Sequence, residues 1–170
     1  MRDKRQRQTV TLSFVPADLI KWIFAVVLIV LIVSKFVADR TSNASFESVQ
    51  KAVEKTVRED ETMLEGDNNM VKRLYGINPS EYEGVMLRYP STNMNVDEVL
   101  LVKLKSTQQQ EAVKAAIESR LETQKKNFDG YGTNQYSILE KSVIDVRGNY
   151  IMFAVAEKTD PIVRAFEKSL

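Results

Sequence analysis

Cysteine and histidine are both absent from this chain of 170 residues. Their absence excludes disulfides, thiol nucleophiles, zinc sites of the usual ligand types and the side chain that most often transfers protons near neutral pH. It also excludes a lipid-modified N-terminal cysteine, so any membrane attachment must come from the polypeptide itself. The redox compartment stays open, because a chain without cysteine is compatible with either environment.

Motifs that carry common chemistry are missing as well. The sequence contains no G-x-S-x-G nucleophile elbow, no phosphate-binding loop and no Asp-x-Asp calcium loop. We therefore expect no cofactor, no metal and no catalysis by this protein itself.

The charged residues are unevenly distributed, although the net charge is only +1. Six of the 24 basic residues but only two of the 23 acidic residues lie in the first 35 positions, which leaves 18 basic and 21 acidic residues beyond them. That remainder is slightly acidic and has no basic stripe, so it lacks the charge pattern that attracts a phosphate backbone. We expect no nucleic acid partner.

One long hydrophobic run lies near the N-terminus. It begins at Trp22, ends at Val33 and is flanked by Lys21 and Lys35. If both lysines extend their amines toward lipid head groups, a helix over 19–38 is about 30 Å long, the thickness of the hydrocarbon core of a bilayer. We therefore predict a single transmembrane helix that acts as a membrane anchor.

The basic residues before this helix predict its orientation. Because positively charged flanks stay inside the cell, residues 1–18 are expected to be a cytoplasmic tail and the rest of the chain to be extracytoplasmic. The predicted location is the cell membrane, in a single pass. The competing interpretation is a cleavable export signal that ends at the small-x-small tripeptide of Ser42, Asn43 and Ala44, which would give a secreted protein.

Beyond the apolar segment, about 130 residues remain, enough for one compact domain. Within 41–64, the residues Phe46, Val49, Val53 and Val57 recur at helical spacing and predict an amphipathic helix. We set 39–59 apart as a juxtamembrane helix and expect 60–170 to form the extracytoplasmic domain.

Local signals outline the first half of that domain. Asp67 and Gly76 are suited to begin and end a short helix, as N-cap and left-handed stop. Residues 82–90 and 96–106 are rich in Val, Leu and Tyr, and predict two strands that pair as a hairpin through a polar loop. Thr107 and Gln110 then form a capping box, and the long helix after it repeats apolar residues at Val113, Ile117 and Leu121.

The second half predicts a short helix over 133–142, another hairpin and a final helix. The hairpin covers 143–158 and turns at Gly148 and Asn149, a pair suited to positive φ angles. Counting outward from the turn pairs Val146 with Ile151, and Ile144 with Phe153. Asp160 is expected to cap the last helix, whose inner face carries Ile162, Val163, Phe166 and Leu170.

The order of these elements predicts the fold class. Helix, hairpin, helix, hairpin and helix follow one another, which is typical of an α+β domain. We expect helices to cover one face of a mainly antiparallel sheet built from two hairpins.

The amino-acid sequences of three segments resemble a known family. RLYGINPSEYEGVMLRYPSTNMNVDEVLLVKLK, ESRLETQKKNFDGYGTNQYSILEKSVI and VRGNYIMFAV are similar to the bacterial family filed as domain of unknown function 4358. The resemblance runs from about residue 60 to the C-terminus and is most specific at 73–76, 120–131 and 147–150. It implies an exported or membrane-tethered protein of Gram-positive bacteria, associated with O-acyltransferase systems that modify surface polysaccharides. This chain departs from members with a lipidated cysteine.

Two groups of side chains are candidates for a partner or glycan surface. Arg120, Gln124 and Phe128 are spaced by four on one helix edge, with Tyr131 just beyond, and this edge could present donors and aromatic surface to a sugar or a protein. The alternative is that Phe128 and Tyr131 seal the core while Arg120 pairs with a carboxylate. The tyrosines form the second group, since flat rings with polar tips suit glycans and half-buried packing equally: Tyr75, Tyr82, Tyr89, Tyr131, Tyr136 and Tyr150.

Four acidic residues bracket the first predicted hairpin. Glu81, Glu83, Asp97 and Glu98 could supply the paired carboxylates of a glycoside hydrolase, although acidic residues near strand ends are usually solvated. The leading interpretation remains a membrane-anchored accessory domain that binds an envelope protein or a polysaccharide-modifying partner. An envelope glycan-binding protein or a carboxylate-based hydrolase is the alternative.

Overall fold

The computed structural model describes residues 21–22, 24–30, 41–57 and 63–170. The chain divides into two compact units, Met1–Val37 and Ala38–Leu170. Residues 21–22 and 24–30 of the first unit are helical. Among the described residues, no helix has the length and hydropathy needed to cross a bilayer. The predicted tail 1–18 and the predicted anchor residues Val33 and Lys35 lie outside them.

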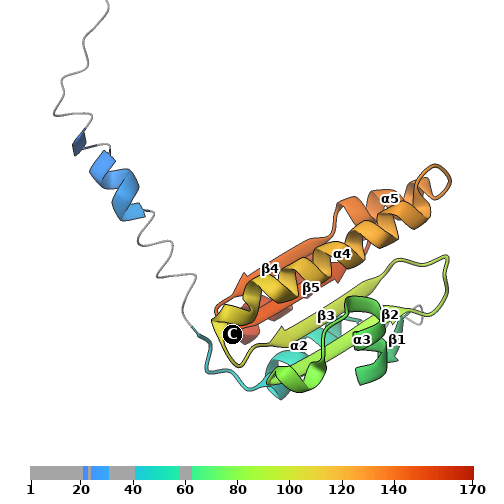
Figure 1. Ribbon diagram of the computed structural model, residues 1–170, viewed down its shortest axis with the longest axis horizontal. Helices are drawn as coiled ribbons and strands as arrows, with labels where there is room; N and C mark the ends of the chain where they lie inside the picture. Colours follow the sequence, from blue (N-terminus) through green and yellow to red (C-terminus); the bar gives the residue numbers. More distant parts are fainter. Residues whose placement is uncertain (1–20, 23, 31–40, 58–62) are drawn as a thin grey trace, which may run out of the picture. The chain divides into compact units, whose positions relative to one another are not determined.

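The second unit is an α+β domain around one five-stranded antiparallel sheet (Figure 1). Along the sheet the order is β1-β2-β3-β5-β4, and every neighbouring pair is antiparallel. The predicted α+β class with an antiparallel sheet is confirmed, as are the two hairpins β2–β3 and β4–β5. The strands are β1 (Met63–Gly66), β2 (Gly84–Pro90), β3 (Glu98–Lys103), β4 (Val143–Arg147) and β5 (Tyr150–Val155).

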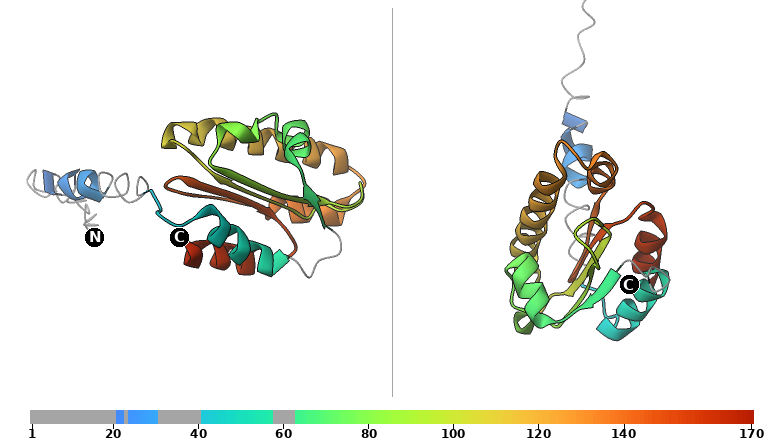
Figure 2. Two further views of the ribbon diagram at one scale, coloured as in Figure 1. Left: turned by 90° about the horizontal axis from the view of Figure 1, so that it is seen from below. Right: turned by 90° about the vertical axis from the view of Figure 1, so that its right-hand side faces the viewer.

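Helices lie against both faces of the sheet, not one as the element order predicted (Figure 2). One face is covered by α3, α4 and α5, and the other by α2 and α6, which lie side by side. The helices are α2 (Phe46–Val57), α3 (Asn68–Tyr75), α4 (Gln110–Phe128), α5 (Thr133–Glu140) and α6 (Asp160–Ser169), with 3-10 turns η1 (Pro79–Glu81) and η2 (Thr107–Gln109).

The central strands explain why cover on both faces is needed. Every residue of β3 and β5 is buried, because successive side chains of a strand point to opposite faces and both faces are apolar. Leu100 and Phe153 lie in the core under α3, α4 and α5. Leu101 and Met152 lie in the core under α2 and α6. A strand with one solvated face would alternate with polar residues, and these two do not.

The helix α2 is part of this domain. Its Val49, Val53 and Val57 are buried in the same core as Phe166 of α6. The predicted amphipathic helix is therefore confirmed. Its apolar face packs against the sheet and α6. The segment that the sequence analysis set apart as 39–59 thus contributes its helix to the unit Ala38–Leu170.

Several local predictions are confirmed. Asp67 Oδ1 accepts a hydrogen bond from the Met70 amide at 2.8 Å, and Gly76 ends α3 with a φ of 69°. The register at the second hairpin pairs the predicted residues across the turn. Gly148 has a φ of 57° while Asn149 does not have a positive φ, which is the pattern of a type II′ turn.

Other local predictions are wrong because contacts elsewhere decide them. Met63 and Leu64 do not continue a helix but begin β1. This strand lies at the edge of the sheet and pairs with β2. The capping box is one residue earlier than predicted: Ser106 and Gln109 form it, because the 3-10 turn η2 precedes α4. Asp160 begins α6 without a side-chain capping bond.

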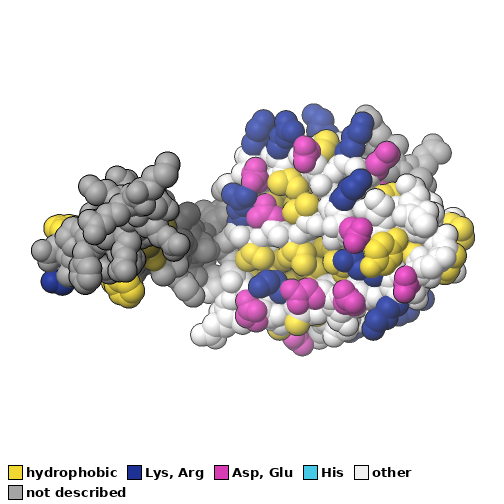
Figure 3. Space-filling model, turned by 90° about the horizontal axis from the view of Figure 1, so that it is seen from above, with side chains coloured by type: hydrophobic (Ala, Val, Ile, Leu, Met, Phe, Trp, Pro, Cys, Tyr) yellow, Lys and Arg dark blue, Asp and Glu magenta, His cyan; other side chains and the backbone are white. Residues whose placement is uncertain are grey.

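The strand β4 forms one edge of the sheet. Figure 3 shows the side of the domain above this edge, where hydrophobic side chains form a band with charged side chains on either side. Asp145 and Arg147 of β4 pair with each other, and Arg147 also pairs with Glu167 of α6. Charges on an edge strand oppose pairing with the edge of another chain.

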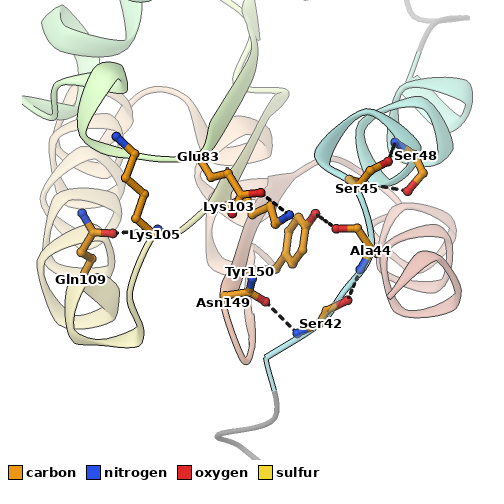
Figure 4. Close-up of polar contacts among 10 residues, drawn as sticks. All are labelled: Ser42, Ala44, Ser45, Ser48, Glu83, Lys103, Lys105, Gln109, Asn149 and Tyr150. Atoms are coloured by element: carbon orange, nitrogen blue, oxygen red, sulfur yellow. Dashed lines mark hydrogen bonds and ion pairs between the residues drawn. The ribbon is translucent and has the colours of Figure 1, made fainter.

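The N-terminal end of the domain is bonded to the β4–β5 turn (Figure 4). The Ser42 amide donates to Asn149 Oδ1 at 2.8 Å, and the Tyr150 hydroxyl donates to the Ala44 carbonyl at 2.9 Å. Lys103 Nζ lies 5.6 Å from the centre of the Tyr150 ring and pairs with Glu83. The segment before α2 is therefore fixed at the same end of the sheet as the tight turn.

Tyr150 gives a prediction for stability at high pH. Burial, together with the negative charge of Glu83, raises the pKa of Tyr150 to about 12. A tyrosine in the unfolded chain has a pKa of about 10. The contribution of Tyr150 to the free energy of unfolding is therefore fully present below that pH and is lost as the pH rises through its folded pKa. We expect the free energy of unfolding of the full-length protein to fall between those two values, as measured by guanidinium denaturation followed by circular dichroism.

The variant Tyr150→Phe isolates this contribution. It loses the hydrogen bond to Ala44, so we expect a loss of about 1 kcal/mol at neutral pH. Between about pH 10 and the folded pKa of about 12, the variant should lose stability less steeply than the wild type. An equal slope in both proteins would contradict the assignment.

Candidate functional site

An open groove lies on the side of the domain that carries α3 and α4. Its volume is about 480 Å³, and it lies between the C-terminal half of α4, the end of β2 and the β2–β3 loop. Its walls are mainly polar amides, two guanidinium groups and three aromatic rings. The lining residues are Arg73, Leu74, Tyr89, Pro90, Thr92, Asn93, Asn95, Arg120, Gln124, Asn127, Phe128 and Tyr131.

A buried carboxylate lies next to the groove, at the start of β3. Glu98 has no solvent exposure, and both of its oxygens accept hydrogen bonds. Oε1 accepts from the Tyr75 hydroxyl and from Arg120 Nε at 3.2 Å, while Oε2 accepts from Arg120 Nη2 at 2.7 Å and from Gln124 Nε2 at 3.0 Å. The forked contact of Arg120 with both oxygens is the arrangement that a planar guanidinium makes best with a carboxylate.

This network fixes the ionisation of its members. Burial raises the pKa of Tyr75 well above its usual value, and the charge and hydrogen bond of Glu98 raise it further. Burial by itself would lower the pKa of Arg120, but the hydrogen bond and charge of Glu98 raise it, and the net shift is upward. Tyr75 therefore stays a neutral donor and Arg120 stays a cation across the physiological range.

Gln124 is constrained by the same carboxylate. Its Nε2 must face Glu98, so its Oε1 points away from the network. That oxygen is buried and accepts no hydrogen bond from any residue that the structure describes. An unsatisfied buried acceptor costs about 1–3 kcal/mol. Gln124 lines the groove, but this oxygen is closed off from solvent in the structure.

The rim of the groove carries groups that are open to solvent. The Tyr131 side chain is 70% exposed and packs its ring 6.0 Å from that of the buried Phe128. Arg73 of α3 is exposed and has no ion-pair partner among the residues with described coordinates. None of the lining residues is acidic, so the groove is a positively charged site on a slightly acidic domain.

The structure brings together all four residues of the first predicted group. Arg120, Gln124, Phe128 and Tyr131 all line the groove. The alternative assignment is correct for two of them, since Phe128 is buried and Arg120 pairs with a carboxylate, and wrong for the exposed Tyr131.

Most of the second predicted group, the tyrosines, are not at the groove surface. Tyr75 is buried beside Glu98, and Tyr150 is buried in the core on the opposite face of the sheet. Tyr82 is buried as well, and Tyr136 is partly buried against the core. Of the six tyrosines, only Tyr89 and Tyr131 line the groove.

The four predicted carboxylates do not converge. The antiparallel register places Lys103 beside Glu83 at one end of the hairpin, while Glu98 is five residues away along β3. That separation is about 17 Å, beyond the 5 to 10 Å (roughly) that glycoside hydrolysis uses. In the part of the chain that is described, no group of three or more acidic side chains is placed to hold a metal ion.

Sequence reasoning missed Glu98 as the centre of the network and Arg73 with the asparagines as part of the rim. Glu98 is spaced by two residues from Leu100 and by four from Val102. This spacing places all three side chains on the face of β3 under α4, and it is the signal that could have identified Glu98. The signal for the rim is the polar STNMN loop at 91–95. Neither signal identifies the other side of the groove, because α3 and α4 lie far from this loop in the sequence.

The buried pair predicts a specific pattern of stability. Arg120→Met leaves the Glu98 carboxylate without its cation, and we expect the free energy of unfolding to fall by about 3–5 kcal/mol. Glu98→Gln removes the buried charge, so adding it to Arg120→Met should recover part of that loss. Chemical denaturation followed by circular dichroism measures both.

The matched control is Arg164→Met on α6, whose ion pair with Asp160 is exposed on both sides. We expect a change below about 0.5 kcal/mol for it. If Glu98→Gln instead lowers the stability of Arg120→Met as much as it lowers that of the wild type, the two residues are not coupled.

Comparisons with known proteins identify the family only. No curated protein sequence and no solved structure is significantly similar to this chain. A family model described as a domain of unknown function, DUF4358, matches residues 55–156, which include the whole sheet and every residue of the groove. This match confirms the family that the sequence resemblance predicted. Because the match covers more than half of the chain, the protein belongs to the DUF4358 family.

Proposed function

We propose that this protein is a membrane-anchored binding domain of the cell envelope. In this proposal the segment 19–38 spans the membrane once, the N-terminus is cytoplasmic and the domain is extracytoplasmic. The groove between α3, α4 and the β2–β3 loop is the binding site, and its ligand is a component of the envelope. The family resemblance further suggests an accessory role for a polysaccharide-modification system, such as one for O-acylation.

One observation carries the binding role: the groove presents donors and acceptors whose positions are already fixed. The network around Glu98 immobilises Arg120 and Gln124, so a ligand that meets them loses little of its binding energy to ordering side chains. Glu98 itself is fully buried and accepts from three side chains, which leaves it no contact with a substrate. These features favour recognition over acid or base chemistry.

The contacts of the domain's N-terminal end support an anchor that is retained. Cleavage after Ala44 would remove Ser42, which bonds to Asn149 and to the Leu170 carbonyl, and would also remove the acceptor of the buried Tyr150 hydroxyl. A signal peptide is not expected to contribute hydrogen bonds to the mature fold. Tethering the domain to a membrane raises its effective concentration there, so that a weak contact is sufficient.

The binding role is tested through the exposed ring of the groove. Tyr131→Ala removes aromatic surface without opening the core, and truncation of an aromatic anchor typically weakens binding roughly tenfold. We expect full-length protein with this change to recover much less protein and carbohydrate than the wild type when purified from detergent-solubilised membranes. The control is Met94→Ala, which removes another exposed apolar side chain on the β2–β3 loop outside the groove. Equal recovery with Tyr131→Ala and with the wild type would remove the groove from consideration.

The anchor is tested separately. We expect alkaline carbonate to leave the full-length protein in the membrane fraction, because a spanning apolar helix is not released by charge and pH changes. Protease added to wall-stripped intact cells should digest the domain and spare the N-terminal tail. Release of the uncleaved protein into the supernatant, or protection of the domain, would overturn the anchored topology.

A further inference from the structure

We infer that the groove binds a segment of anionic polysaccharide, with a carboxylate or phosphate group of the chain paired to Arg73 and sugar hydroxyls bonded to the amides around it. This inference rests on the proposed function, because it assumes that the groove is the binding site. It adds the chemical class of the ligand.

The charge of the groove argues for an anion. Two guanidinium groups line it, but the charge of Arg120 is neutralised by Glu98. The charge of Arg73 has no such partner within the described part of the chain, and no acidic residue lines the groove. Because the chain beyond residue 35 is net acidic, this cation is a local feature and does not belong to a general basic surface. A planar guanidinium that is free to bond in two places suits a carboxylate or a phosphate.

The uncharged groups of the groove argue for a sugar. Asn93, Asn95 and Asn127 each carry a donor and an acceptor, which matches hydroxyl groups that also do both. The exposed ring of Tyr131 offers a flat apolar surface with a polar tip, which suits the apolar face of a sugar ring.

A peptide fits the groove less well. Extended peptides commonly add a strand to a free sheet edge, but β2 is paired with β1 on one side and with β3 on the other. Helical peptides need an apolar trough, whereas half of the residues that line this groove carry amides or guanidinium groups. An acidic peptide therefore serves as a competing ligand in the test.

The test measures binding of defined probes to the full-length protein in detergent by calorimetric titration. The probes are a galacturonic acid hexamer, its fully methyl-esterified form, a phosphate-linked mannose oligomer and a glutamate hexapeptide. The ester keeps the sugar and removes the charge, so it isolates the anion. The two anionic polymers distinguish a carboxylate from a phosphate as the natural group.

Two variants of α3 isolate the cation. Arg73→Gln and Lys72→Gln each remove one positive charge from adjacent exposed positions, and only Arg73 lines the groove. We expect at least one anionic polymer to bind, the ester to bind at least tenfold more weakly than the acid if the acid is the ligand, and Arg73→Gln to lower affinity roughly tenfold. Lys72→Gln should change affinity less than about twofold, since an exposed charge outside the site is screened.

The outcomes separate this inference from the proposed function. If neither polymer binds, if the two variants lose affinity equally, or if the glutamate peptide binds more tightly than both polymers, the inference is overturned. The proposed function still stands in that case when recovery from membranes depends on Tyr131. If recovery does not depend on Tyr131 either, both proposals fail.

Discussion

The burial of one carboxylate constrains the whole face of the domain on which the groove lies. Glu98 is completely removed from water at the start of a central strand, where an ionised group without partners would be strongly unfavourable. Arg120, Gln124 and Tyr75 together supply four hydrogen bonds to it. Because these donors come from α3 and α4, the requirement to satisfy one charge fixes two helices against β3.

The same constraint separates stability from recognition within the groove. Groups on its inner side are committed to the carboxylate, whereas Tyr131 and Arg73 at the rim make no such contact and are open to solvent. A rigid floor under an accessible rim is suited to binding an extended molecule, since the positions of the inner groups do not depend on the ligand. Substitutions at the rim are therefore expected to have little effect on the fold.

The opposite face of the sheet has a different role. There α2 and α6 close a mainly apolar core, which also buries Lys103 beside Tyr150, and the segment before α2 is bonded to the β4–β5 turn and to the C-terminus. The segment just before α2 therefore packs on the face of the sheet opposite α4.

The sequence alone determined the features that depend on neighbours along the chain. The capped helix from Asp67 to Gly76, the register at Gly148 and the apolar face of α2 all follow from spacings of a few residues. Only the tertiary structure decided that both faces of the sheet are covered, that β1 pairs with β2 and that Glu98 is buried. Its donors lie 22 to 26 residues away along the chain, so no local pattern could distinguish this carboxylate from a solvated one. Whether a charge is buried depends on which distant groups fold against it.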